Sequence, residues 1–375
     1  MRSRLVLVAL AIAWTVTAIG CGTSFRLPTE TRTGRNYSTD NSYQMVATWE
    51  GMDGIADILL TQGIGTQLFL LFQEPGTGTA PRGRVRQYAL KAAPPRPAPI
   101  TGREMNGLFN PHALCAAGDF IYVLDQGDTA LARDPVTGDV TNPALYWRVL
   151  KYSLLGGNPI TTFTDTSMGF VQGIAADEQG RVYVSGSSIE NIPDPQDARI
   201  KTRSFVFQVR RYLPVTGGPP DPYMPDSPDW VRDTPRAYVE EGSGVSTTLD
   251  PRGLYYTAAG IPGGPALYFA DLGKNWAQGL PTGGAPFKVD AAQDTTLNVP
   301  EDITADRAGF FYVADTGNQR VLRFDQYGAF IQRVNVELDS NGLPLVSPIA
   351  VAADDSLVYV GDRATAQVIR YQRRK

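Results

Sequence analysis

The sequence predicts an all-β fold: a six-bladed β-propeller of four-stranded antiparallel blades, in which an N-terminal strand closes the last blade. Three observations predict it. A pair of strand motifs recurs six times, a short apolar strand precedes each pair, and the last repeat ends one strand short of a complete blade. Repeats of this length are typical of propellers, whose units bury their faces by stacking around a ring.

The first recurring motif is an apolar strand with an aromatic side chain in its middle. Its six copies contain Phe69, Tyr122, Tyr183, Tyr255, Tyr312 and Tyr359. A second motif, of the form Val-x-Arg-Tyr, follows each copy and ends at Tyr88, Tyr152, Tyr212, Phe269, Phe324 and Tyr371. Apolar and polar residues alternate in this second motif, as in strands with one face against a neighbouring layer. We expect the two motifs to be the second and third strands of each blade.

The short phrase before each pair supplies the innermost strand. It is clearest at 173–177, 302–306 and 350–354, and each of these segments ends in Asp. A further strand of the type found at 329–334 separates the repeats. Each unit then has four strands, and because no unit can bury both faces alone, the units are expected to stack radially.

The two ends of the repeat region complement each other. The last repeat ends at its third strand, 367–371, and 44–49 precedes the first repeat without a blade of its own. We expect 44–49 to be the outer strand of the sixth blade, because this pairing removes an exposed sheet edge.

The fifth repeat, 300–328, resembles an NHL repeat. The matching features are Pro300, an Asp, the Tyr-Val-Ala-Asp strand, the Thr-Gly-Asn turn and the closing Gly328. The other repeats match in part, and the resemblance extends over roughly 44–375. It implies a propeller fold and no particular function, because propellers of this type serve binding, scaffolding and catalysis.

The segment 1–20 is predicted to be a signal peptide. Arg2 and Arg4 precede an uncharged apolar stretch, 5–19, which is shorter than the roughly 20 residues of a membrane-spanning helix. Residues 18–21, Ala-Ile-Gly-Cys, resemble the lipobox of bacterial lipoproteins, although the family usually has Leu where Ala stands here. The alternative is a plain secretory signal followed by a cysteine that stands there by chance.

The lipobox resemblance implies an exported lipoprotein, anchored in the cell envelope through Cys21. Its thiol would carry acyl chains such as palmitate, and the partner of this anchor would be a lipid bilayer. The polar segment 21–43 is then a flexible tether, followed by the propeller at 44–375. Gly22 follows the cysteine in place of Asp, which by analogy with enteric lipoproteins favours the outer membrane, provided that the organism has one.

Composition narrows the classes of partner and of stabilising bond. The formal net charge is −4, and no run of Lys or Arg occurs before the last residues, so nucleic acid is not an expected partner. After acylation of Cys21, the one remaining cysteine is Cys115. No intramolecular disulfide is therefore expected, and stability must come from a large core.

Extra length is concentrated in the first three repeats. It lies mainly between the second and third strands, at 73–84, 126–146 and 187–204, with a Pro-rich stretch at 214–235. Such loops share a face with the entry to the innermost strands, and loops on a rigid scaffold carry function. We expect a recognition face for a protein or carbohydrate partner; the alternative is insertion that the surface merely tolerates.

The predicted channel mouth holds the candidate site. The innermost strands are expected to begin at Asp53, His112, Gln172, Val245, Glu301 and Ile349. Four of these side chains are polar, and Asp53, His112 and Glu301 are of types that bind divalent cations. The alternative is a polar, water-filled mouth, which we favour because His112 is the single histidine. No cofactor is predicted beyond this candidate cation.

Other chemistry-bearing residues are assigned structural roles. Asp125, Asp315 and Asp362 end second strands and are interpreted as caps of the loops that follow. Cys115 stands three residues after His112 on one strand, and this odd spacing sends the two side chains to opposite faces, so a thiol nucleophile is not expected. No catalytic residue is predicted.

Two functions remain open from sequence. The first is a membrane-anchored binding or scaffolding propeller for an unidentified ligand or partner. The second is a metal-dependent hydrolase or lyase of the six-bladed lactonase or strictosidine-synthase-like type, in which a channel cation activates water or substrate.

Overall fold

The computed structural model describes most of the propeller region. Described are residues 43–374, apart from 62–64, 74–82, 128–146, 194–200, 216–220, 222, 225–226, 234–238, 241–247, 258–266, 281–295 and 335–344. The predicted signal peptide, Cys21 and the tether up to residue 42 lie outside the described residues. Within the described part, no helix is long and apolar enough to cross a membrane.

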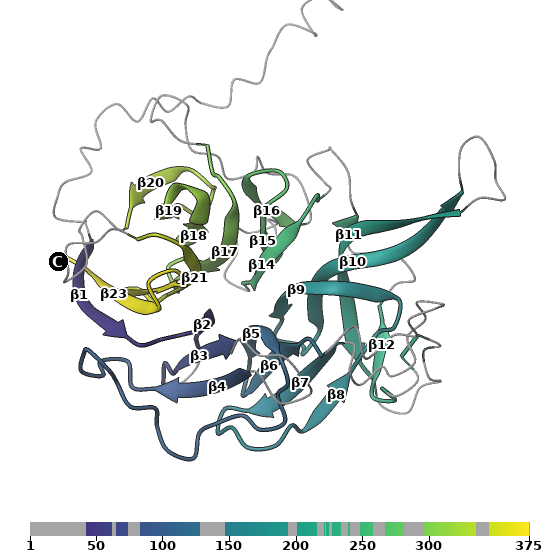
Figure 1. Ribbon diagram of the computed structural model, residues 1–375, viewed down its shortest axis with the longest axis horizontal. Helices are drawn as coiled ribbons and strands as arrows, with labels where there is room; N and C mark the ends of the chain where they lie inside the picture. Colours follow the sequence, from purple (N-terminus) through teal and green to yellow (C-terminus); the bar gives the residue numbers. More distant parts are fainter. Residues whose placement is uncertain are drawn as a thin grey trace, which may run out of the picture. The chain divides into compact units, whose positions relative to one another are not determined.

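The strands form six antiparallel sheets arranged around a ring (Figure 1). Blade one is β2 (Ile55–Leu60), β3 (Leu68–Gln73) and β4 (Gly83–Tyr88). Blade two is β5 (Pro111–Ala117), β6 (Phe120–Asp125), β7 (Arg148–Ser153) and β8 (Thr161–Phe163). Blade three is β9 (Met168–Ala176), β10 (Val182–Pro193), β11 (Lys201–Pro214) and β12 (Trp230–Arg232), with β13 (Val239–Glu240) also paired to β11.

The second half of the chain builds the remaining blades in the same order. Blade four is β14 (Pro251–Tyr256), β15 (Leu267–Asp271) and β16 (Trp276–Leu280). Blade five is β17 (Pro300–Ala305), β18 (Phe311–Asp315), β19 (Arg320–Phe324) and β20 (Phe330–Arg333), with a 3-10 turn at Thr316–Asn318. Blade six is β21 (Pro348–Ala353), β22 (Leu357–Asp362), β23 (Gln367–Arg373) and the N-terminal strand β1 (Tyr43–Glu50).

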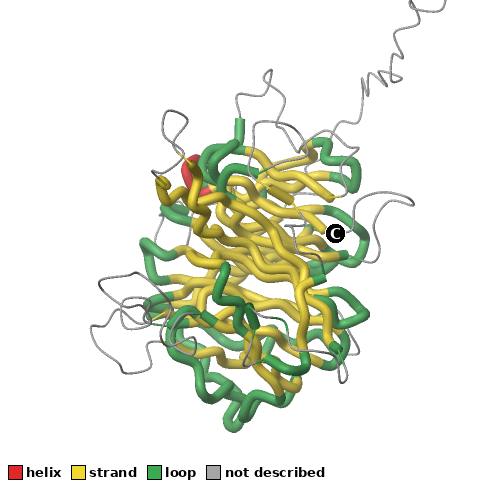
Figure 2. The backbone as a smooth tube through the Cα atoms, turned by 90° about the vertical axis from the view of Figure 1, so that its right-hand side faces the viewer, coloured by secondary structure: helices red, strands yellow, loops and turns green. Residues whose placement is uncertain are grey.

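Six innermost strands surround the centre of the ring. They are β2, β5, β9, β14, β17 and β21; each contacts the next, and β21 contacts β2. The blades stand side by side in the turned view (Figure 2). The predicted all-β, six-bladed propeller is therefore confirmed.

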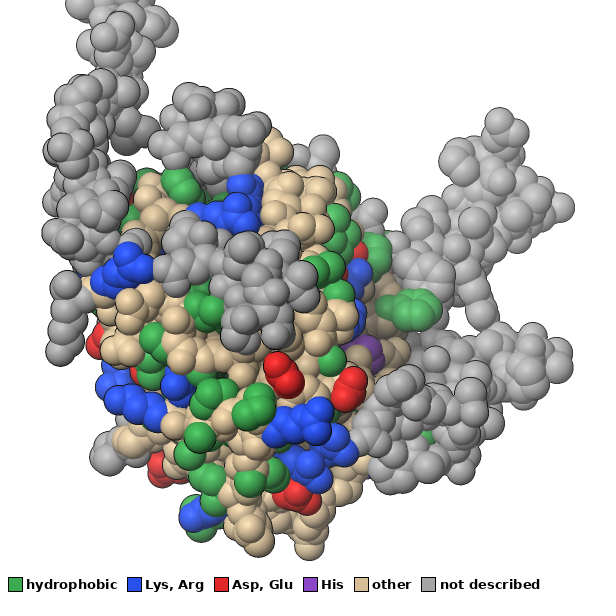
Figure 3. Space-filling model, turned by 60° about the vertical axis from the view of Figure 1, so that its left-hand side comes forward, with side chains coloured by type: hydrophobic (Ala, Val, Ile, Leu, Met, Phe, Trp, Pro, Cys, Tyr) green, Lys and Arg blue, Asp and Glu red, His purple; other side chains and the backbone are tan. Residues whose placement is uncertain are grey.

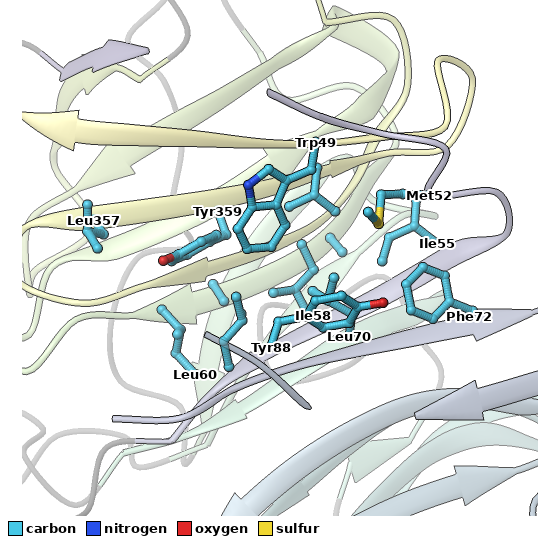
Figure 4. Close-up of a cluster of buried hydrophobic side chains, with 14 of the residues drawn as sticks. Trp49, Met52, Ile55, Ile58, Leu60, Leu70, Phe72, Tyr88, Leu357 and Tyr359 are labelled. Atoms are coloured by element: carbon cyan, nitrogen blue, oxygen red, sulfur yellow. The ribbon is translucent and has the colours of Figure 1, made fainter. Parts of the chain in front are cut away.

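The predicted closure of the ring is also confirmed. Strand β1 pairs antiparallel with β23, from Tyr43 opposite Arg373 to Glu50 opposite Gln367. Tyr43, predicted to end the tether, is the first residue of this strand. On the inner side of the strand, Trp49 is fully buried, with its ring centroid 6.0 Å from those of both Tyr88 and Tyr359 (Figure 4). The N-terminal strand thus joins blade six to blade one.

The core is divided among the blade interfaces. Each of six clusters of buried apolar side chains combines residues of two neighbouring blades. Burial of this apolar surface between stacked sheets is the main stabilising term, at roughly 25 cal/mol per Å². A blade therefore depends on both neighbours for its stability.

Blade four departs from the prediction by one strand. The segment around Tyr255 belongs to the innermost strand β14, and Tyr268 in β15 lies in the second strand. Residues 253–258 have the apolar and aromatic pattern of a second strand, so the local pattern pointed to the wrong register. Strand β14 pairs with β15, which pairs with β16 on its other edge, and β14 contacts β9 and β17; β14 is therefore the innermost strand.

Blade one has three assigned strands, and an irregular segment covers its outer edge. The amide of Ile100 donates to the carbonyl of Gln87 (2.8 Å), and that of Met105 donates to the carbonyl of Val85 (3.3 Å). These hydrogen bonds cover part of the free edge of β4. The segment therefore replaces a fourth strand at this edge, although it does not have strand geometry.

Candidate functional site

The central channel opens into a cavity at each end. A narrower cavity of about 230 Å³ lies where the innermost strands begin, and a wider one of about 570 Å³ lies where they end. Gln73, Gln126 and Arg363, which end or follow second strands, also line the narrower cavity. The loops between second and third strands therefore start at this mouth, as predicted, although most inserted residues lie outside the described part.

β-Bulges direct side chains into the narrow mouth. In blades one, two, five and six the pairing between the first two strands shifts register, which leaves Ala56, His112, Glu301 and Ile349 bulged. A bulged residue is unpaired and re-aimed relative to the ladder. All four of these residues line the cavity, together with Gln172 of blade three and Arg252 of blade four.

Two of the predicted mouth positions are different residues in the structure. Asp53 lies exposed in the turn before β2, and Ala56 takes the mouth position in blade one. Val245 lies outside the described residues, and Arg252 takes the position in blade four. His112, Gln172, Glu301 and Ile349 do line the mouth. In blade one the predicted position was three residues too early. The sequence alignment matched Asp53 to Glu301 because both are acidic, whereas the structure has Ala56 at the corresponding position.

Buried carboxylates fix the loops that lead into the mouth. Asp125 accepts hydrogen bonds from the amides of Phe109 and Asn110 (2.9 and 2.6 Å), which precede β5. The other members of this set are Asp271, Asp315 and Asp362, each fully buried and bonded to amides before the innermost strand of its own blade. The predicted structural role of Asp125, Asp315 and Asp362 is confirmed. The loop that each one holds is mainly the loop that leads into the innermost strand, and not the loop that follows the second strand. Sequence reasoning missed Asp271 because blade four was misregistered.

The mouth combines neutral hydrogen-bonding groups with an arginine-rich rim. Burial, together with the nearby charges of Arg363 and Arg252, lowers the pKa of His112 to about 4, so the imidazole is neutral at pH 7. The histidine reaches the surface at this face (purple in Figure 3). Arg252 lies 3.8 Å from Glu301, and Phe170 on the lining is 52% exposed with a φ of 34°.

Two polar atoms at this mouth are buried without a partner. Among the described residues, the Gln172 Oε1 and the Arg252 Nε have no hydrogen-bond partner. A buried polar atom left unpaired costs about 1–3 kcal/mol, and such atoms in a native fold call for an explanation. One is an acceptor and the other a donor, so a hydroxyl-bearing molecule could satisfy both.

The candidate cation ligands do not gather. His112 and Glu301 share the mouth, but Asp53 is not on its lining. In the part of the chain that the structure describes, no three His, Cys, Asp or Glu side chains lie close enough together to hold a metal ion. The described residues at this mouth therefore do not fit the donor set that a divalent cation needs.

The two cavities meet at a narrow waist. Asp57, Ala113, Gly253 and Asp302 line both of them. A Cβ added to Gly253 would lie 2.4 Å from Asp302 Oδ1, so this position must be glycine for the carboxylate to fit. The waist is therefore formed by small residues and two acidic side chains.

The acidic pair at the waist was missed from sequence. Asp57 accepts hydrogen bonds from its neighbouring amide and from Leu114 of blade two (both 2.7 Å), and Asp302 does the same with Val351 of blade six (both 2.8 Å). Burial raises the pKa of both carboxyls, and repulsion from Asp302 raises that of Asp57 further. The recurring Asp-Ile dipeptide, a charge within an apolar strand, was the available signal.

The wide cavity contains Cys115. His112 lines the narrow cavity and Cys115 the wide one, so the two residues lie toward opposite ends of the channel. Burial and the charge of Asp57 raise the pKa of the Cys115 thiol well above its ordinary value. A thiol so protonated is a poor nucleophile.

Comparison with known families agrees with this architecture. A sequence model of the NHL repeat matches residues 297–324, which include β17 to β19, and a model described as a beta-propeller repeat matches 154–193. The protein is an NHL-repeat β-propeller. Comparison of the sequence with curated proteins gives no match.

Two solved structures resemble this NHL-repeat propeller. A protein of unknown function from Bacteroides thetaiotaomicron is 12% identical with a TM-score of 0.52, and the match covers 88% of this chain and 76% of that one. Virginiamycin B lyase from Staphylococcus aureus is also 12% identical, with a TM-score of 0.46 and coverage of 88% and 99%. The first likeness shows a shared fold, and neither assigns an activity.

Proposed function

We propose that this NHL-repeat propeller is a binding module, and that its ligand occupies the narrow mouth of the channel. The observation that carries the proposal is that two residues lining this mouth, Gln172 and Arg252, each have a buried polar atom without a partner, Oε1 and Nε respectively. The rim of bulged residues and the four capping carboxylates make this mouth a fixed receptor. Loops of blades one to three begin around it and would enlarge the contact surface.

The chemistry of the mouth favours a carbohydrate. Three glutamine amides, Gln73, Gln126 and Gln172, stand with a neutral imidazole around one small cavity. Amides and neutral imidazole each donate and accept, which matches the mixed donor and acceptor character of sugar hydroxyls. The partly exposed Phe170 ring offers an apolar surface to a sugar face.

Calorimetric titration with a panel of neutral oligosaccharides tests this assignment. We expect at least one to bind, and Gln172→Leu to weaken that binding about tenfold, because the ligand hydroxyl loses its acceptor. The free variant should melt no lower than the parent, since an unpaired polar atom has been removed. Gln179→Leu, an exposed glutamine outside the narrow mouth, is the matched control and should bind like the parent.

Failure would take one of two forms. If no neutral oligosaccharide binds, the carbohydrate assignment is wrong. If Gln172→Leu binds as tightly as the parent while ligand does bind, the site lies elsewhere on the propeller.

Lipid anchoring completes the proposed function. It rests on the sequence of residues 18–21 and on Cys21, and it would display the propeller at the cell envelope, with the outer membrane favoured where one exists. The hydrolase or lyase alternative has less support, because the described residues supply no cluster of three metal ligands.

A further inference from the structure

The charged side chains that line the wide end of the channel are all acidic. Its charged side chains are Asp57, Asp119, Glu178 and Asp302, and no Lys, Arg or His of the described chain lines it. The remaining lining is largely aliphatic, with Tyr255 and Tyr256 on the blade-four wall. The cavity of about 570 Å³ is within the range of small-molecule sites.

We propose that the wide cavity binds a small organic cation of the quaternary ammonium class, with its charge facing Asp57 and Asp302 and its methyl groups against the apolar wall. This site lies at the opposite end of the channel from the proposed carbohydrate site and does not depend on it. Complementary charge in a confined, partly apolar space is the physical basis of the proposal.

The bonding of the two carboxylates favours this class over a metal ion. Each of the four carboxyl oxygens of Asp57 and Asp302 accepts a backbone amide. The pair therefore offers negative charge, but each of its oxygens already accepts a hydrogen bond from a backbone amide. A metal ion needs several directional oxygen ligands, whereas a quaternary ammonium has no N–H and is recognised by diffuse charge and by aromatic faces. Tyr255 and Tyr256 belong to the same lining, with their rings packed on Phe311 and Tyr183 of the neighbouring blades.

Proton linkage gives the proposal a distinctive signature. The raised pKa values of Asp57 and Asp302 mean that the empty waist retains a proton toward neutral pH. A bound cation favours the ionised pair, so its affinity must rise with pH through the titration of the pair. The other titratable groups of this cavity are Cys115, Asp119, Glu178, Tyr255 and Tyr256. From the narrow side, the waist faces His112, Arg252, Glu301 and Arg363.

Choline and its uncharged carbon isostere, in which a tert-butyl group replaces the trimethylammonium group, form the decisive pair of probes. Ligand-observed NMR titration of the purified protein should show choline binding at least about tenfold more tightly than the isostere. Choline affinity should increase between about pH 5 and about pH 9, and that of the isostere should stay constant.

Variants locate the charge that is recognised. Asp302→Asn should lower choline affinity about tenfold and leave isostere binding unchanged. Because Asn loses one of the two acceptors and could weaken the fold, Glu178→Gln at the exposed rim provides a second test, with a smaller loss in the same direction. Asp53→Asn removes the same charge from an exposed turn outside both cavities and is the matched control.

Cys115 reports occupancy directly. Because it lines the wide cavity, saturating choline should slow its modification by a small thiol reagent. Equal binding of choline and the isostere, absence of choline binding, or choline binding without protection of Cys115 would each overturn the proposal.

Discussion

At the scale of the residue, His112 shows how burial in the propeller changes the pKa of a side chain. Burial at the channel mouth, with Arg363 and Arg252 nearby, lowers its pKa from 6.5 to about 4. In the unfolded chain His112 therefore becomes protonated near pH 6.5, whereas in the folded protein it stays neutral until about pH 4. The stability contribution of the neutral imidazole is present above pH 6.5 and is lost as pH falls through this window.

The single histidine makes this prediction simple to check. The imidazole proton resonances in one-dimensional NMR spectra should titrate with a midpoint near pH 4. In His112→Gln, the free energy of unfolding should fall less steeply from pH 6.5 to 4 than in the parent. A midpoint near 6.5 in the folded protein would show that the imidazole is solvated and that the mouth is more open than the structure has it.

At the scale of the element, strand β1 closes the ring. It covers the edge of β23 and buries Trp49 between aromatic side chains of blades one and six. Deletion of residues 22–49 should therefore be severely destabilising, because truncation of one buried aromatic alone typically costs about 3–5 kcal/mol. Deletion of 22–40, a polar stretch before β1, should change thermal stability little. Melting curves of the two deletions decide it: equal melting temperatures would mean that the ring closes by another route.

At the scale of the whole molecule, the sequence predicts a lipid anchor at Cys21 followed by the propeller. Cys21→Ser should abolish incorporation of a fatty-acid label and release the protein from membranes or leave it unprocessed, because one thioether carries the acyl chains. The propeller, from β1 onward, should fold and melt as in the parent. Label retained in the serine variant would contradict the lipobox assignment.

The repeat pattern was sufficient to predict the ring. A period of two within each strand, a recurring aromatic residue and a recurring closing Asp are local features, and they placed the second and third strands of five of the six blades correctly. The missing last strand and the orphan segment at 44–49 then predicted closure by β1. Asp125, Asp315 and Asp362 were correctly interpreted as structural for the same reason, since their positions at strand ends repeat.

The tertiary structure decided the contents of the channel. A β-bulge inserts one extra residue and shifts the alternation of side chains, and the local sequence does not mark where the bulge falls, so sequence could not show that Ala56, and not Asp53, reaches the narrow mouth. Nor could it show that Asp57 and Asp302 line the same waist, because they come from blades one and five, which closure of the ring brings to the two sides of blade six. A strand's identity as strand is set by local periodicity, but the chemistry of this channel is set by register and by which innermost strands line the same part of the channel.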